Sequence, residues 1–369
     1  MQNNPYDEWK EYVAQERALL VPILRERGFE LDEEQPHIGG ERYLMQAVTT
    51  KSGKKLILLG TEMRTGERVA IKATREAAGK EELHHERICR LAINSLPFAY
   101  EPFLGPEERY FGERSGFLIS VQRYIAQESS FLERPIKDQF RYALDAFKAQ
   151  EGSHAATYEQ VRGIRHTLGV QHSQDYLHQA REFARTIQSA AQESHPHLAD
   201  LNPLLTEAMR RGERRIEQYA NFLTHTDFVP HNFRIQDEQL YLLDYSSFRF
   251  GNKHEGWARF LNFMLLHNPE LEQAFLKYFA DNRAPEEQES LRIMRIYRLG
   301  EIICYYLQTL PRSVDTLLTL NNARVDFWAA ALRAQLTQSD LALEVREHYK
   351  QVRDSLRSEE EKKRQKDLN

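Results

Sequence analysis

The part of this 369-residue chain with the clearest capacity for chemistry runs from His225 to Asn232 and has the form H-x-D-x-x-x-x-N. The carboxylate of Asp227 can accept a proton from a hydroxyl group. The amide oxygen of Asn232 is a ligand of the kind that Mg²⁺ prefers. Pro230, between them, favours a turn that would aim both side chains at one place. This spacing is typical of a loop that catalyses phosphoryl transfer.

A second carboxylate follows at a distance that suits the same site. Residues 233–243 read as a β-hairpin with its turn at 236–239, and such a hairpin would bring Asp244 back beside Asn232. Two oxygen ligands at one point are what magnesium requires when phosphate oxygens and water complete its octahedron. We therefore predict Asn232 and Asp244 as metal ligands and Asp227 as the catalytic base.

The third feature is the sequence Val-Ala-Ile-Lys at residues 69–72. A lysine that ends an apolar strand is unusual as a structural residue, and in this pattern it contacts the α- and β-phosphates of ATP. Glu86, on the helix expected next, can pair with Lys72 and hold it toward the nucleotide. Glu81 and Glu82 are alternatives for that role.

Together these features resemble the aminoglycoside phosphotransferase and choline kinase family of the protein-kinase-like superfamily. Proteins of that family have the same loop pattern, commonly with proline at the same place. Their metal-binding Asp follows a short hairpin in an apolar-Asp-aromatic context, as at 243–245 here. The resemblance covers about residues 40–260 and implies ATP binding between two lobes. It implies that Gln122 to Tyr124 form the hinge and contact the nucleotide, and that His225 orients the catalytic loop.

The resemblance is incomplete at several positions. The expected phosphate-covering loop contains only Ser52 and Gly53 as small residues, with lysines at 54 and 55 adding positive charge. Val229 replaces the lysine of protein kinases, and neither Asp-Phe-Gly nor Ala-Pro-Glu occurs, which disfavours a protein substrate. The family often has an Asp before the next helix, where this chain offers Glu255 as a substitute.

The elements around these motifs predict the fold class. Helical periodicity spans Tyr6 to Arg27, and strands are expected at 43–49, 56–59, 68–72 and 116–121, with a helix at 80–96. Further helices are expected at 139–150, 175–192, 203–222, 269–280, 286–309, 325–336 and 341–357. We predict an α+β, protein-kinase-like two-lobed fold, with a small antiparallel-sheet N-terminal lobe and a larger, mainly helical C-terminal lobe. The predicted divisions are a lobe at 1–121 with an N-terminal helix and a nucleotide-covering sheet, a hinge at 122–126, a helical lobe at 127–357 and a charged, disordered tail at 358–369.

Composition narrows the function classes. The net charge of −5 argues against nucleic acid as the main partner. The two cysteines, Cys89 and Cys304, read as buried free thiols, which suits a reducing cytoplasm. Neither a leader peptide nor an apolar stretch of transmembrane length is recognisable, so we expect a cytoplasmic protein that does not bind membranes.

The expected function is transfer of the ATP γ-phosphate to a hydroxyl of a small molecule, with ATP and Mg²⁺ as cofactors. An aminoglycoside, a choline-like amino alcohol and a sugar all remain open as acceptors, as does the oligomeric state. The alternative is a catalytically inactive, kinase-like ATP-binding or scaffold protein. The helical residues 139–220 could also serve a partner.

Overall fold

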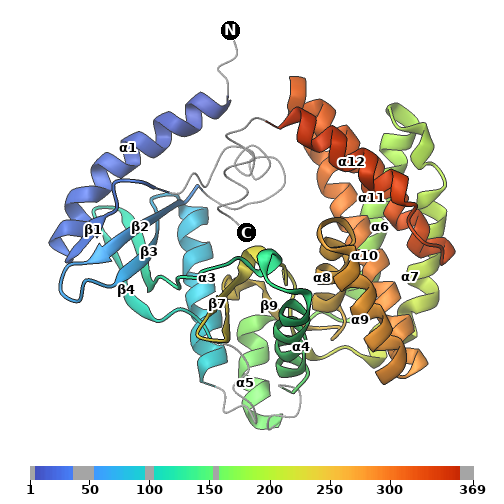
Figure 1. Ribbon diagram of the computed structural model, residues 1–369, viewed down its shortest axis with the longest axis horizontal. Helices are drawn as coiled ribbons and strands as arrows, with labels where there is room; N and C mark the ends of the chain where they lie inside the picture. The colour runs from blue at the N-terminus through green and yellow to red at the C-terminus, as the bar shows by residue number, and fades with distance from the viewer. Residues whose placement is uncertain (1–4, 36–53, 96–103, 153–157, 358–369) are drawn as a thin grey trace.

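The computed structural model describes residues 5–35, 54–95, 104–152 and 158–357. The strand predicted at 43–49, the loop residues Ser52 and Gly53, and the tail predicted at 358–369 lie outside these ranges. Figure 1 shows a small sheet at the left with α1 above it, α3 between the sheet and the rest of the molecule, β7 and β9 near the centre, and a large group of helices at the right.

The smaller part is a five-stranded antiparallel sheet in the order β1-β2-β3-β5-β4. Its strands are β1 (Phe29–Leu31), β2 (Leu56–Glu62), β3 (Arg68–Thr74), β4 (Glu108–Arg114) and β5 (Phe117–Arg123). Alternate residues of β2, β3 and β5 point to one face and form a core with Leu20 and Leu24 of helix α1 (Pro5–Glu26). Helix α3 (Ala77–Asn94) follows β3 and packs on the sheet and on the larger part.

The larger part is mainly helical. Its helices are α4 (Ile136–Gly152), α5 (Tyr158–Leu168), α6 (Ser173–Glu193), α7 (Leu201–Gln218), α8 (Glu255–His267), α9 (Pro269–Asn282), α10 (Pro285–Thr309), α11 (Asp315–Thr337) and α12 (Leu343–Leu356). Two antiparallel strand pairs interrupt them: β6 (Phe222–His225) with β9 (Phe248–Gly251), and β7 (Phe233–Gln236) with β8 (Gln239–Leu242). The predicted fold class, a small antiparallel sheet followed by a larger helical part, is confirmed.

Several elements differ from their predictions. The sequence patterns missed β1, β4, β6, β9, α5 and α8, placed the end of α7 too late and began α11 too late. Strand β4 was missed because its sequence is charged and it forms an edge of the sheet. Helix α8 was missed because it is buried almost all round, so its sequence lacks the broad polar face of a surface helix.

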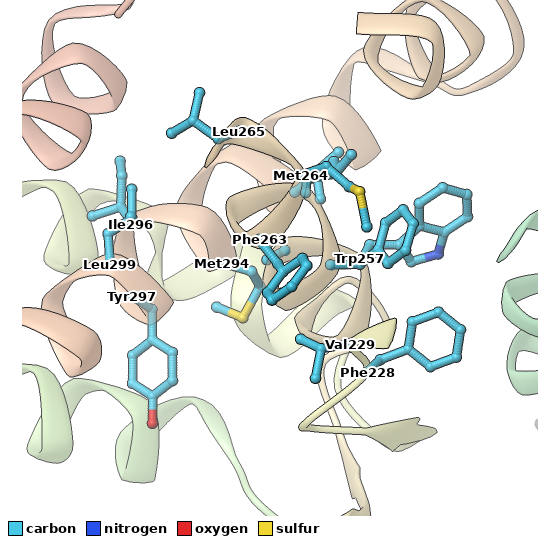
Figure 2. Close-up of a cluster of buried hydrophobic side chains, with 14 of the residues drawn as sticks. Phe228, Val229, Trp257, Phe263, Met264, Leu265, Met294, Ile296, Tyr297 and Leu299 are labelled. Atoms are coloured by element: carbon cyan, nitrogen blue, oxygen red, sulfur yellow. The ribbon is translucent and has the colours of Figure 1, made fainter. Parts of the chain in front are cut away.

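The core of the helical part anchors the predicted catalytic loop, residues 225–232. Figure 2 shows Phe228 and Val229 of that loop among buried side chains of α8 and α10, including Trp257. Phe228 is fully buried, and its ring centroid lies 4.5 Å from that of Phe147 and 4.5 Å from that of Phe233. These two apolar residues fix the loop, so the polar residues on either side of them are held in defined positions.

Candidate functional site

The predicted catalytic loop follows β6, and its last residue, Asn232, is hydrogen-bonded to Asp227 near its start. The Asn232 Nδ2 atom donates hydrogen bonds to the backbone carbonyl of Asp227 at 2.8 Å and to Asp227 Oδ2 at 3.0 Å. A turn of 3₁₀ helix at Pro230–Asn232 shortens the path between the two side chains. The structure therefore brings Asp227 and Asn232 together, with the buried pair 228–229 beneath them.

The hairpin predicted between Asn232 and Asp244 is present. Its two turn residues, Asp237 and Glu238, have φ of 51° and 62°, as a tight two-residue hairpin turn requires. At the base of the hairpin, the amide of Leu243 donates to the carbonyl of Asn232 at 2.9 Å. The structure thus places Asp244 next to the catalytic loop.

The buried side chain of His225 connects the loop at 225–232 to the segment that contains Asp244. Its ring is fully buried, and Nε2 lies 3.1 Å from the carbonyl oxygens of both Leu243 and Asp244. Since carbonyls only accept hydrogen bonds, we assign the proton to Nε2. The backbone amide of His225 donates to Gln150 Oε1 at 3.0 Å, so α4 also holds the loop.

Asp244 is held in an uncommon conformation by its neighbours. It has a left-handed backbone, with φ of 57°, and its carboxylate accepts hydrogen bonds from the hydroxyls of Ser246 and Ser247. Burial raises the pKa of Asp244, but the nearby Lys72 ammonium and these hydroxyls more than offset burial and keep the pKa below its usual value. The turn at 245–247 packs on α3.

Lys72 projects from β3 and pairs with α3. Its Nζ atom lies 2.7 Å from both carboxylate oxygens of the buried Glu86. The Lys72 ammonium also lowers the pKa of Asp244, so its charge acts on carboxylates of both α3 and the segment that follows β8. Of the alternatives to Glu86, Glu82 pairs with Lys55 instead, and Glu81 is exposed.

The structure describes only some of the other residues that were predicted to contact the nucleotide. Gln122 lies buried near the end of β5, and the amide of Tyr124 donates to the carbonyl of Arg68 at 2.9 Å, where the chain leaves the sheet. The hinge boundaries stay a prediction. Ser52 and Gly53 are outside the described residues. The ammonium of Lys54 lies 4.9 Å from the centre of the Tyr12 ring.

Arg259, which the sequence analysis did not select, contacts the predicted base. Its Nε atom donates to Asp227 Oδ1 at 2.9 Å, and the two side chains are 26% and 30% exposed. Burial would raise the pKa of Asp227, but the positive charges of Arg259 and Arg298 help to outweigh it, and this pKa lies well below its usual range. One signal was available: Arg259 is the only charged residue between Glu255 and His267.

Glu255, which the sequence analysis offered as a substitute for the family's Asp, is the first residue of α8, and that role stays a prediction. It is completely buried and accepts hydrogen bonds from the Tyr176 hydroxyl at 2.6 Å, from Arg298 at 3.3 Å and from Arg249. These ion pairs neutralise a buried carboxylate that would otherwise be costly. Glu255 therefore holds Arg249 and Arg298 in place, and none of these hydrogen bonds involves Asp227.

Comparison with solved structures identifies the architecture. Aminoglycoside phosphotransferase APH(4)-Ia superposes with a TM-score of 0.56 at 14% identity, over 89% of this chain and 99% of that one. A macrolide 2′-phosphotransferase type I gives 0.51 at 15% identity, over 84% and 96%. The ADP-bound aminoglycoside phosphotransferase APH(2″)-Ib gives 0.50 at 15%, over 77% and 92%. The fold is that of the aminoglycoside phosphotransferases. No family model matches the sequence, and no match is found among curated proteins.

Within this aminoglycoside phosphotransferase fold, the available donors suit a hard cation. The Asn232 Oδ1 atom accepts no hydrogen bond from any described residue, and the Asp244 carboxylate lies on the adjoining segment. Among the described residues, no group of three or more His, Cys, Asp or Glu side chains could hold a metal ion by itself. An amide oxygen and a carboxylate fit Mg²⁺ that takes its other ligands from phosphate and water.

Two further findings concern the cysteines and the helices of this chain. Both cysteines are buried and free, as predicted. In the part of the chain that the structure describes, no helix combines the length and the apolar character needed to cross a membrane.

Proposed function

We propose that this chain is an ATP- and Mg²⁺-dependent phosphotransferase that moves the γ-phosphate of ATP to a hydroxyl group of a small molecule. One observation carries the proposal: the loop with Asp227 and Asn232 is hydrogen-bonded to the segment with Asp244, whose pKa the Lys72 ammonium of β3 lowers. A cation, two metal-type oxygen donors and a carboxylate base are the parts that phosphoryl transfer needs.

On the nucleotide side, Lys72 would bind the α- and β-phosphates while Glu86 holds its ammonium in place. Gln122 and Tyr124, at the end of the sheet, would contact the nucleotide at the hinge, and Ser52 and Gly53 would cover the phosphates.

Asn232 and Asp244 would hold the metal ion. Mg²⁺ bound there would reduce the negative charge on the phosphate oxygens. The pKa of Asp244 is below its usual value, so Asp244 is a carboxylate at neutral pH, as a metal ligand must be.

On the acceptor side, Asp227 would orient the substrate hydroxyl through a hydrogen bond. The hydroxyl oxygen forms a bond to the γ-phosphorus while the bond from that phosphorus to the β,γ-bridging oxygen breaks and ADP leaves. The hydroxyl proton passes to Asp227 and then to solvent. The low pKa of Asp227 makes it a weak base, which suits a loose transition state in which the proton moves late and positioning dominates.

The decisive experiment combines nucleotide binding with turnover. Titration calorimetry with Mg-AMP-PNP and assays of ADP formation, over aminoglycosides, choline-like amino alcohols and sugars, compare the wild type with Asp227→Asn and Asp244→Asn. We expect Asp227→Asn to lose turnover by roughly a thousandfold with little change in nucleotide affinity, and Asp244→Asn to lose both.

Asp237→Asn is the matched control, because Asp237 is exposed in the nearby hairpin turn and asparagine tolerates its left-handed backbone. Near-normal turnover in Asp227→Asn would refute the assigned base. Nucleotide binding by the wild type without transfer to any acceptor or to water would favour the alternative of an inactive ATP-binding protein.

A further inference from the structure

Arg259 lies beside Asp227, the residue that would receive the acceptor hydroxyl. Arg259 uses Nε to bind Asp227, while its two Nη atoms donate no hydrogen bond to any described residue. The guanidinium group therefore presents a free edge next to the carboxylate where the acceptor hydroxyl would dock. Such an edge is suited to an oxyanion, because its parallel N–H groups match two oxygens of a carboxylate or phosphate.

Glu255, which lies on the same helix as Arg259, positions two more arginines. Arg298 and Arg249 each donate to Glu255, and their side chains are 11% and 27% exposed. The Nε atoms of both are buried without a hydrogen-bond partner among the described residues. Glu255 itself is completely buried, so a ligand would meet the arginines and not the carboxylate that orders them.

The acidic groups in this area are already engaged. Glu301 is paired with Arg298 at 2.9 Å. Asp227 would receive a hydrogen bond from the hydroxyl of the phosphate acceptor. An acceptor with amino groups beside its reactive hydroxyl would meet the free edge of Arg259 and be repelled. An acceptor with an anionic group at that position would gain a charge-assisted pair of hydrogen bonds.

We propose that the phosphate acceptor is a hydroxy compound carrying an oxyanion, either a carboxylate or a phosphate, and that the free edge of Arg259 binds this group. The inference rests on the proposed function, since it places the acceptor by the role of Asp227. Arg259 thereby determines specificity as well as positioning the base.

Anion binding is tested first, without knowledge of the natural acceptor. Protein saturated with Mg-AMP-PNP is titrated with malonate and with sulfate, against sodium chloride at equal ionic strength. We expect saturable binding of at least one anion, weakened roughly tenfold or more in Arg259→Gln and less in Arg259→Lys, which keeps the charge. Arg185→Gln is the control, because Arg185 is 72% exposed on α6. Failure of both anions to bind overturns the inference.

Turnover then distinguishes the two anion types. Glycerol, glycerate, glycerol 3-phosphate and choline are compared as acceptors at saturating MgATP. We expect kcat/KM to be roughly tenfold or more higher for an anionic member than for glycerol, and lowest for choline. Faster transfer to glycerol or choline than to both anionic compounds would overturn the inference while leaving the proposed phosphotransferase intact. Failure of the protein to bind Mg-AMP-PNP would refute the proposed function, and the same anion titration without nucleotide would then test the anion site by itself.

Discussion

Arg259 Nε donates a hydrogen bond to Asp227 Oδ1 across 2.9 Å, so a cation on α8 holds the carboxylate that the catalytic loop presents. The interaction connects two elements that come together only in the folded chain. It keeps the carboxylate ionised and fixes its orientation, which are separate effects that experiments can resolve.

The first prediction concerns pH. Removing the guanidinium in Arg259→Gln raises the pKa of Asp227, because the stabilising charge is lost while burial remains. Asp227 must be ionised to accept a proton, so the acid limb of the ADP-formation profile moves to higher pH. Arg259→Lys should show a smaller shift. Lower turnover at every pH with an unmoved acid limb would mean that Arg259 only orients the loop.

The second prediction concerns the nucleotide. Lys72→Met should weaken Mg-AMP-PNP binding by roughly tenfold or more, because the ammonium that contacts the phosphates is lost. Glu86→Gln should act in the same direction but less strongly, since Lys72 remains. Calorimetry measures both affinities. Lys277→Met, at a side chain that is 78% exposed on α9, should bind like the wild type.

The third prediction concerns the support beneath the loop. Phe228→Ala removes a fully buried ring from the cluster of hydrophobic side chains in Figure 2 and should lower the free energy of unfolding by about 3–5 kcal/mol. Urea denaturation measures the change. Val314→Ala, at an exposed position, should stay within about 0.5 kcal/mol. A similar small loss for Phe228→Ala would show that the loop does not depend on this anchor.

The fourth prediction concerns stability against pH. Burial lowers the pKa of His254 to about 4 from a usual 6.5. Between these values the unfolded chain binds a proton that the folded chain does not, so stability is greatest above pH 6.5 and falls as the pH decreases toward 4. The pKa of the nearby Glu287 is lowered to about 2, so Glu287 adds a further loss of stability as the pH falls below its usual pKa of 4.5.

Urea denaturation between pH 7 and pH 5 therefore isolates His254 from Glu287. His254→Asn should flatten this part of the stability profile, whereas the same substitution at the exposed His178 should not. An unchanged slope in His254→Asn would place the proton uptake at another group.

Much of the candidate site was accessible from sequence because its parts are encoded locally. The turn at Pro230, the two-residue hairpin turn before Asp244 and the apolar strand ending in Lys72 are patterns of neighbouring residues. The partners of Glu255 could not be predicted, because the sequence shows a carboxylate at a helix start but not which side chains surround it.

The amino-acid sequence by itself determined the two-part architecture and the order of the residues with chemical capacity, since strand alternation, helix periodicity and turn residues act over short distances. Only the tertiary structure decided which charges meet. The pairs Arg259–Asp227 and Arg298–Glu255 join elements that are separate in the chain, and their partners follow from how α8 and α10 pack behind the catalytic loop. Packing geometry therefore sets the charge around the acceptor, because ion pairing depends on distance and burial in space and not on spacing along the sequence.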